Sequence, residues 1–319
     1  MKSRFLLPLL LAVALVAPTA AVAAPAKGTQ APPKATVKVQ LGHLHGGKAR
    51  ILSTVPVSGT VSPFAPNQKV KVTFYLNGRK VKRTSVKVRK GKGGSGVFKA
   101  RIRVEEAGKY AVSASHAPTA LLGGDSTVRK SWKVSFPALS QGKCGPVVLA
   151  FKKAMRKMGY IANSGSCFGA KTARGVLAYR KVNDMTRSYR AGKGLVKKVF
   201  AGRGGYRVRH PGAGQHVEVP LSKQVLVFTK GDKPYAIYPI SSGKSSTPTV
   251  TGHFEFIRTE PGYNSHGMYY SWYFYGGYAV HGYESVPDYP ASHGCLRTFI
   301  ADQPEIYERI NYGEDIFVF

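Results

Sequence analysis

Five side chains capable of chemistry lie close together near the end of this 319-residue chain, in the stretch "YAVHGYESVPDYPASHGCLR" at residues 278–297. They belong to two histidines, two serines and one cysteine. A thiol is a poor nucleophile at neutral pH, but a neighbouring imidazole can take its proton and hold an ion pair with it. Cys295 therefore has four open roles: catalytic nucleophile, disulfide partner, metal ligand or buried thiol.

The compartment decides which of these roles is chemically open to a cysteine, and the N-terminus indicates the compartment. Lys2 and Arg4 precede the apolar run "FLLPLLLAVALV", and a small-residue segment with an A-x-A pattern at residues 21–23 follows. This layout is typical of a secretory signal peptide, so we expect residues 1–23 to be removed on export. The alternative is an uncleaved membrane anchor, because residues 5–26 carry no charge and are just long enough to span a bilayer. After cleavage we expect no stable membrane insertion.

The charge of the chain predicts its partners. It is +33, and 33 − 2 = +31 remains once Lys2 and Arg4 leave with the signal peptide. An exported protein does not normally meet nucleic acid, so we expect no nucleic-acid partner. The positive charge instead favours contact with anionic cell-wall polymers and lipids of a bacterial envelope, which places the protein in the cell wall or periplasmic space.

A flexible leader at residues 24–35 precedes a segment, residues 36–136, that reads as all β. Short alternating runs such as "VKVTFYL" and "KYAVSAS", separated by turn signals, predict an immunoglobulin-like β module. The stretch "RKVKRTSVKVRKGK" at residues 79–92 places eight basic residues on one predicted hairpin. It is either a solvated strand edge blocked by lysines or a polyanion-binding face.

Residues 141–200 change to a helical period. Apolar side chains recur at helical spacing in "GPVVLAFKKAMRKMGYI" and again in "AKTARGVLAYRKVN", which predicts two helices. Cys144 and Cys167 flank the first helix. In an oxidising compartment two nearby cysteines most simply form a disulfide, and closing this loop contributes about 3 kcal/mol. Cys295 is then the odd cysteine, which in an exported protein is either intermolecular or reactive.

Residues 215–319 return to a β-rich pattern. The runs "HVEVP", "KQVLVFT" and "PYAIYPI" predict strands, the last two joined by a tight hairpin at "KGDK". The aromatic run "MYYSWYFYGGYAVHG" predicts a further strand that is interrupted by Gly276 and Gly277. Paired glycines inside a strand indicate a bulge, a close approach by a ligand, or simple irregularity.

Three motifs in this segment, in the order "ISSGKSSTPTVTGHFEF", "GGYAVHG" and "SHGCLR", resemble the catalytic domain of the L,D-transpeptidases over residues 215–319. The stretch "MGYIANSGSCFGAKTARGVLAYRK" resembles in part the peptidoglycan-binding repeat of cell-wall enzymes. The expected fold class is therefore multidomain: an immunoglobulin-like β module, a small α-helical module, and a β-rich L,D-transpeptidase-like catalytic domain at the C-terminus.

The resemblance also implies a reaction. The enzyme would attack peptidoglycan stem peptides at the bond between the third residue, through its L-centre, and the terminal D-alanine. An acyl-enzyme would form on Cys295, and a side-chain amine of a neighbouring stem would resolve it to a 3→3 crosslink. It further implies that carbapenem-type β-lactams acylate Cys295.

The residues around Cys295 support such a mechanism on their own chemistry. His281 ends a strand and can reach Cys295 as its base once the loop "YESVPDYPA" folds back. The backbone carbonyl of Gly282 can fix the imidazole tautomer. Gly294 lets the chain turn sharply, so that amides near Gly294 and Cys295 can face an oxyanion.

The remaining site residues are expected from the resemblance. Ser292 and His293 would shape the site, with a purely structural role as the open alternative for His293. Arg297 stands where many members of the family have asparagine, and we assign it, with Gly276 and Gly277, to substrate binding.

Other readings of the same residues remain open. His253, His266, His281, His293 and Cys295 offer nitrogen and sulfur ligands, but none of the tight metal-ligand spacings is present, so we expect no metal and no cofactor. Water in place of the amine would make the enzyme an L,D-carboxypeptidase. A third reading is a non-catalytic wall-binding protein, which the intact "HG" and "SHGC" motifs argue against.

Overall fold

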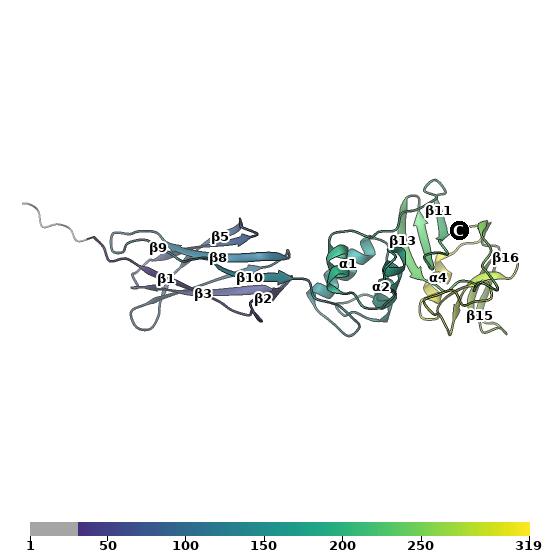
Figure 1. The fold of residues 1–319 in the computed structure, drawn as a ribbon, viewed down its shortest axis with the longest axis horizontal. Coiled ribbons are helices and arrows are strands. Elements are labelled where there is room, and N and C mark those ends of the chain that lie inside the picture. The colour runs from purple at the N-terminus through teal and green to yellow at the C-terminus, as the bar shows by residue number, and fades with distance from the viewer. Residues whose placement is uncertain (1–30) are drawn as a thin grey trace, which may run out of the picture.

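The computed structural model describes residues 31–319, which form three parts in a row along one axis (Figure 1). A β unit lies at one end, three helices lie in the middle, and a second β-rich part with the C-terminus lies at the other end. The predicted signal peptide at residues 1–23 and most of the predicted leader lie outside the described residues. Across residues 31–319, no helix has both the length and the hydropathy that crossing a membrane requires.

Two sheets form the first part. One contains, in spatial order, β1 (Thr36–Leu41), β3 (Thr54–Ser62), β7 (Gly96–Arg103) and β6 (Arg89–Lys90). The other contains β2 (Lys48–Arg50), β10 (Lys130–Ser135), β8 (Gly108–His116), β4 (Lys69–Leu76) and β5 (Arg79–Lys87), with β9 (Asp125–Ser126) paired to β8. Alternate residues of both sheets, among them Val57, Phe98, Phe74 and Trp132, share one buried core. The immunoglobulin-like classification of this unit stays a prediction.

The basic stretch at residues 79–92 is not one hairpin, and that prediction is wrong. Strand β5 lies at the edge of one sheet and β6 at the edge of the other. The chain crosses between the sheets at the buried Val88, whose amide donates to the Gln68 carbonyl at 2.9 Å. The crossing occurs because Val88 adds an apolar side chain to the core between two exposed basic runs.

Three helices, rather than the expected two, make up the middle part: α1 (Pro146–Lys157), α2 (Ala170–Val182) and α3 (Lys193–Phe200). Helix α1 begins with a proline, which is favourable there because an N–H at the first helical position would have no acceptor within the helix. Its buried side chains Val148, Phe151 and Met155 recur on one face, as an amphipathic helix requires. The predicted Cys144–Cys167 disulfide is confirmed.

The last part contains two sheets and one helix. The five-stranded sheet has the order β13 (Lys233–Pro239), β12 (Val225–Lys230), β11 (Gln215–Val219), β19 (Asp315–Val318) and β14 (Gly252–Glu255). The four-stranded sheet has the order β15 (Arg258–Tyr263), β16 (Tyr269–Tyr275), β17 (Tyr278–Tyr283) and β18 (Leu296–Phe299). Helix α4 (Gln303–Arg309), which the sequence did not predict, packs against β16. The pairs β11–β19 and β17–β18 are parallel.

The middle helices share a core with the five-stranded sheet. Alternate residues of β12 point to opposite faces: Val225 and Val227 join the core of the helices, whereas Leu226 and Phe228 join the core of the last part. The contact is also polar, because the Arg174 guanidinium on α2 binds the buried Asp302 carboxylate through two bonds of 2.5 and 2.6 Å. The three helices and the last part are therefore packed as one body.

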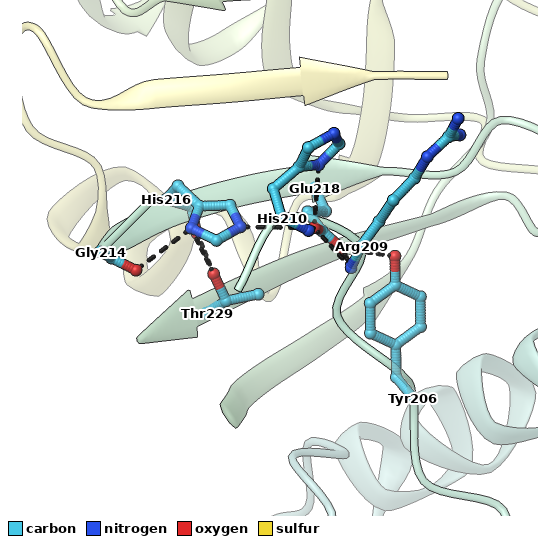
Figure 2. Close-up of polar contacts among 7 residues, drawn as sticks. All are labelled: Tyr206, Arg209, His210, Gly214, His216, Glu218 and Thr229. Atoms are coloured by element: carbon cyan, nitrogen blue, oxygen red, sulfur yellow. Dashed lines mark hydrogen bonds and ion pairs between the residues drawn. The ribbon is translucent and has the colours of Figure 1, made fainter. Parts of the chain in front are cut away.

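A buried carboxylate fixes the segment that leads from the helices into the five-stranded sheet. Figure 2 shows Tyr206, Arg209 and His210 of this segment converging on Glu218 of β11. Glu218 accepts from the Tyr206 hydroxyl at 2.7 Å and from the Arg209 and His210 amides at 2.8 and 2.6 Å. Burial alone raises the pKa of Glu218, but these bonds and one from His216 outweigh it and hold the pKa below its ordinary value.

We predict that Glu218→Gln lowers the free energy of unfolding by about 1–3 kcal/mol at pH 7, because the donors around the carboxylate lose a charged acceptor. A carboxyl whose folded-state pKa is depressed stabilises the protein above its unfolded pKa, and this contribution is lost as pH falls through the folded pKa. The gap between wild type and variant should therefore close at acid pH in urea unfolding.

The control is Glu255→Gln, which changes an exposed carboxylate on β14 of the same sheet. It should leave the free energy of unfolding within about 0.5 kcal/mol of wild type. Equal effects of the two substitutions at pH 7 would show that the Glu218 cluster does not hold the segment.

Candidate active site

The four residues before β18 form a tight turn that carries Cys295. The Ser292 hydroxyl accepts from the Gly294 amide at 3.0 Å and donates to the Cys295 carbonyl at 2.5 Å. Gly294 has φ +121°, and a Cβ there would lie 2.7 Å from the Tyr278 ring, so this position requires glycine. Of the two amides expected to face an oxyanion, that of Gly294 is occupied by Ser292, which leaves the Cys295 amide.

A hydroxyl-rich loop at residues 241–249 braces this turn. The carbonyl of Ser242 accepts from the Ala291 and Ser292 amides at 2.8 and 2.9 Å. The Thr247 hydroxyl donates to the Ser292 carbonyl at 3.0 Å, and the Thr249 hydroxyl donates to the Gly294 carbonyl at 2.6 Å. This stretch was expected only as part of a motif that carries the resemblance, although its density of serine and threonine was the signal for such bracing.

His281 lies on β17, beside the strand that follows Cys295. The parallel pairing of β17 and β18 sets His281 opposite Arg297. The His281 Nδ1 atom is 2.9 Å from the Gly282 carbonyl oxygen. Since a carbonyl only accepts, Nδ1 carries the proton, and the neutral imidazole presents Nε2 as its basic nitrogen.

His281 and Cys295 line one cavity of about 370 Å³. Its other lining residues, in chain order, are His266, Met268, Tyr283, Ser292, His293 and Arg297. Met268 and Tyr283 were missed, and His266 was considered only as a possible metal ligand, because single residues around an aromatic strand carry no motif. A larger, open cavity of about 950 Å³ is lined by residues of the segment 206–232 and by Phe319, and it contains none of the expected catalytic residues.

The environment keeps both reactive groups neutral at rest. Burial lowers the pKa of His281 to about 4, with the Gly282 bond raising it and the Arg297 charge lowering it. Burial raises the pKa of the Cys295 thiol above its ordinary value, although the Ala279 backbone and the Arg297 charge act in the opposite direction. The resting pair is thus thiol and imidazole rather than an ion pair, and Nε2 is unprotonated at neutral pH.

Gly276 and Gly277 do not interrupt one strand, so that prediction is wrong. They form the turn that joins β16 to β17, with Tyr275 paired to Tyr278 across it. The stretch reads as one strand because aromatic residues continue on both sides, whereas the positive φ of Gly276, +47°, reverses the chain. Gly277 still reaches the site, since its carbonyl accepts from the Cys295 thiol at 3.5 Å.

The remaining site residues lie at different distances from the reactive pair. The Arg297 guanidinium stacks 4.0 Å from the Tyr283 ring centroid, at the cavity. His253 lies away from it on β14, bonded to Asp315 at 2.6 Å. Among the described residues, no group of three or more His, Cys, Asp or Glu is arranged to hold a metal ion.

Comparison with known proteins agrees with this geometry. Residues 214–318 match the family profile YkuD, described as the L,D-transpeptidase catalytic domain. The chain is similar to the crystal structure of the L,D-transpeptidase from Xylanimonas cellulosilytica DSM 15894, with 28% identity, a TM-score of 0.53, and coverage of 57% of this chain and 98% of that one. Comparison with curated proteins gives no significant match.

Two further solved structures have lower structural similarity. An L,D-transpeptidase from Enterococcus faecium is 24% identical over 40% of this chain and 62% of that one, with a TM-score of 0.30. An L,D-transpeptidase from Mycobacterium smegmatis is 11% identical over 89% of this chain and 99% of that one, also with a TM-score of 0.30. The resemblance to the L,D-transpeptidase catalytic domain, expected from three motifs, is confirmed for residues 214–318.

We predict that alkylation by iodoacetamide without reductant labels Cys295 alone, because Cys144 and Cys167 are joined. Since burial raises the thiol pKa, the rate should still be rising at pH 9, where an ordinary thiol is already mostly ionised. Peptide mapping by mass spectrometry identifies the labelled residue. Label on Cys144 or Cys167, or a rate that levels off near pH 7, would contradict this description.

Proposed function

We propose, from the L,D-transpeptidase catalytic domain that residues 214–318 carry, that this protein is a cysteine acyltransferase that forms 3→3 crosslinks between peptidoglycan stem peptides. One observation supports this above the others. Cys295 and His281 line the same cavity, and the Gly282 carbonyl occupies Nδ1, so Nε2 is the nitrogen that can accept the thiol proton. The cell-wall location and export follow from the family and the predicted signal peptide, and belong to the same proposal.

The first step forms a thioester. Cys295 Sγ attacks the carbonyl carbon between the third stem residue and the terminal D-alanine, while its proton passes to His281 Nε2. The C–N bond then breaks, and the imidazolium returns that proton to the D-alanine amine as it leaves. In the second step a side-chain amine of another stem attacks the thioester and gives its surplus proton to His281 Nε2. The C–S bond then breaks, and the imidazolium returns that proton to Cys295 Sγ, which restores the thiol and the neutral imidazole.

A neutral imidazole suits this sequence. The low pKa of His281 keeps Nε2 free to accept a proton at neutral pH, and it makes the imidazolium a ready donor to the leaving amine. The Cys295 amide is the proposed donor to the oxyanion, because the bonds of Ser292 fix the turn that presents it. His293, exposed at the rim of the cavity, is assigned to shaping the site.

Arg297 and the glycine turn are the proposed substrate contacts. The guanidinium lies at the cavity and can bind a stem-peptide carboxylate through two parallel hydrogen bonds. Gly277 lies against the Cys295 thiol, so a side chain at this position would lie close to a stem peptide bound in an extended conformation. Hydrolysis of the thioester by water would give an L,D-carboxypeptidase instead, and product mass after incubation with a tetrapeptide-stem muropeptide separates the two: a crosslinked dimer against a shortened monomer.

The β unit at the N-terminal end is proposed to hold the enzyme on anionic wall polymer. Residues 36–136 contain 20 lysines and arginines against three acidic residues. Among the described residues of this unit, only Arg103 forms an ion pair, with Glu105. The exposed basic side chains of the edge strands β5 and β6 are therefore available to a polyanion.

We predict that Cys295→Ala abolishes both turnover and the covalent adduct with a carbapenem, because the attacking sulfur is gone. His281→Ala should slow acylation by roughly 10²–10⁴-fold, the contribution of a positioned general base. Intact-mass spectrometry measures the adduct, and circular dichroism checks that the fold is retained.

The matched control is His253→Ala, which removes a histidine bonded to Asp315 outside the cavity. It should acylate at the wild-type rate. If His281→Ala acylates as fast as wild type while His293→Ala does not, the base is assigned to the wrong histidine. Wild-type protein that turns over substrate without any adduct at Cys295 would refute the acyl-enzyme.

We predict that binding to isolated walls falls steeply with added salt, since exposed charges are screened beyond about 10 Å at 0.1 M. Replacing Lys80, Arg83 and Lys87 of β5 by glutamine should weaken binding at low salt and leave acylation of Cys295 unchanged. Co-sedimentation measures both effects. Equal binding to walls stripped of anionic polymer, or a flat salt response, would count against this role.

A further inference from the structure

A buried lysine on helix α2 binds the backbone that leads into the active-site loop. Lys181 is 3% exposed, and its ammonium donates to the Ile240 carbonyl at 2.7 Å and to the Gln224 carbonyl at 3.2 Å. Burial lowers its pKa to about 7, with the Arg187 charge also lowering it and Asp288 raising it. These two bonds offset part of the free-energy cost of burying the amine and hold the side chain in place.

The contacts continue from Lys181 to the nucleophile without a break. The side chain of Gln224 donates to the Ser242 hydroxyl at 2.6 Å and accepts from the Ser242 amide at 3.0 Å. The Ser242 carbonyl in turn holds the Ser292 amide at 2.9 Å. Ser292 closes the turn by donating to the Cys295 carbonyl at 2.5 Å.

Gln224 adds an independent observation. Its backbone has φ +55°, a left-handed conformation that is costly for a residue with a side chain. Such a conformation persists where the surroundings fix it, and here Lys181 binds the carbonyl while Ser242 and Leu221 bind the side chain. A strained residue with this many partners is typical of a segment that must keep one geometry.

We propose that Lys181, a residue of the helical part, is a positioning residue for acyl transfer: through Gln224 and Ser242 it holds the Cys295 turn at the distance from His281 that proton transfer requires. This inference rests on the proposed function of Cys295. It makes the helices part of the catalytic apparatus, whatever else they bind.

The chain offers a matched control for this role. Lys152 on α1 is also fully buried, donates to two backbone carbonyls, those of Ser164 and Cys167, at 2.9 and 2.7 Å, and has its pKa lowered by burial. Its contacts lie within the helical part and do not lead to the nucleophile turn. Lys152→Met and Lys181→Met therefore each remove a buried amine that donates to two backbone carbonyls, and only the amine of Lys181 is connected to Cys295.

The experiment compares two rates on each full-length variant that circular dichroism shows to be folded. One is acylation of Cys295 by a carbapenem, which needs the thiol placed against His281. The other is alkylation by iodoacetamide at pH 9, which needs an accessible thiolate but no transfer of its proton to His281. A misplacement of about 1 Å can cost on the order of a hundredfold in rate. We therefore expect the ratio of acylation to alkylation to fall at least tenfold in Lys181→Met and to stay at the wild-type value in Lys152→Met.

The outcomes separate the two proposals. An unchanged ratio in folded Lys181→Met, or an equal fall in Lys152→Met, overturns the positioning role. If iodoacetamide labels Cys295 in wild type but no carbapenem acylates it, the proposed function fails. The pH midpoint of alkylation then tests Lys181 separately: a midpoint in Lys181→Met equal to that of wild type overturns the positioning role by itself. If Lys181→Met does not fold, Ser242→Ala replaces it, because it removes one bond of the same chain of contacts. An unchanged ratio in Ser242→Ala would then overturn the proposal.

Discussion

Strand β12 is apolar on both faces, and most of the architecture follows from covering it. A single strand cannot bury both faces against one layer, so the five-stranded sheet needs a partner on each side. Val225 and Val227 meet the helices, whereas Leu226 and Phe228 meet the four-stranded sheet and α4. Taking away the helices would expose these two valines and Ile237 to water, so the helical part belongs to the stability of the catalytic part.

Polar contacts then fix the geometry that apolar packing only approximates. Arg174 binds Asp302, the residue just before α4, and the next residue, Gln303, accepts from Thr298, whose hydroxyl also lies 3.1 Å from the His281 carbonyl. The helices are thus connected to the strand that carries His281 as well as to the turn that carries Cys295. Apolar layers set the distance between the sheets, and directional bonds fix the strand and the turn that carry His281 and Cys295.

The sequence predicted the features that depend on neighbouring residues, namely strands, a hairpin and the order of the motifs. The alternation in "KQVLVFT" and "PYAIYPI" placed β12, β13 and their hairpin, and motif order placed Cys295 near His281. Helix α3 was missed because it is only eight residues long, which is shorter than the window over which helical spacing can be recognised in a sequence. Lys181 was beyond reach, since its burial depends on carbonyls 43 and 59 residues away, and nothing in a helix sequence distinguishes a buried lysine from an exposed one.

The neutral state of Cys295 has a consequence for durability. The thiolate is the form of cysteine that attacks peroxides and foreign disulfides, so a buried thiol that keeps its proton reacts slowly with them. In the proposed reaction the proton leaves as Sγ attacks a bound carbonyl. Cys144 and Cys167 are joined in a disulfide, whereas Cys295 can stay reduced in the same oxidising surroundings. Its thiol therefore remains available for the proposed acyl transfer.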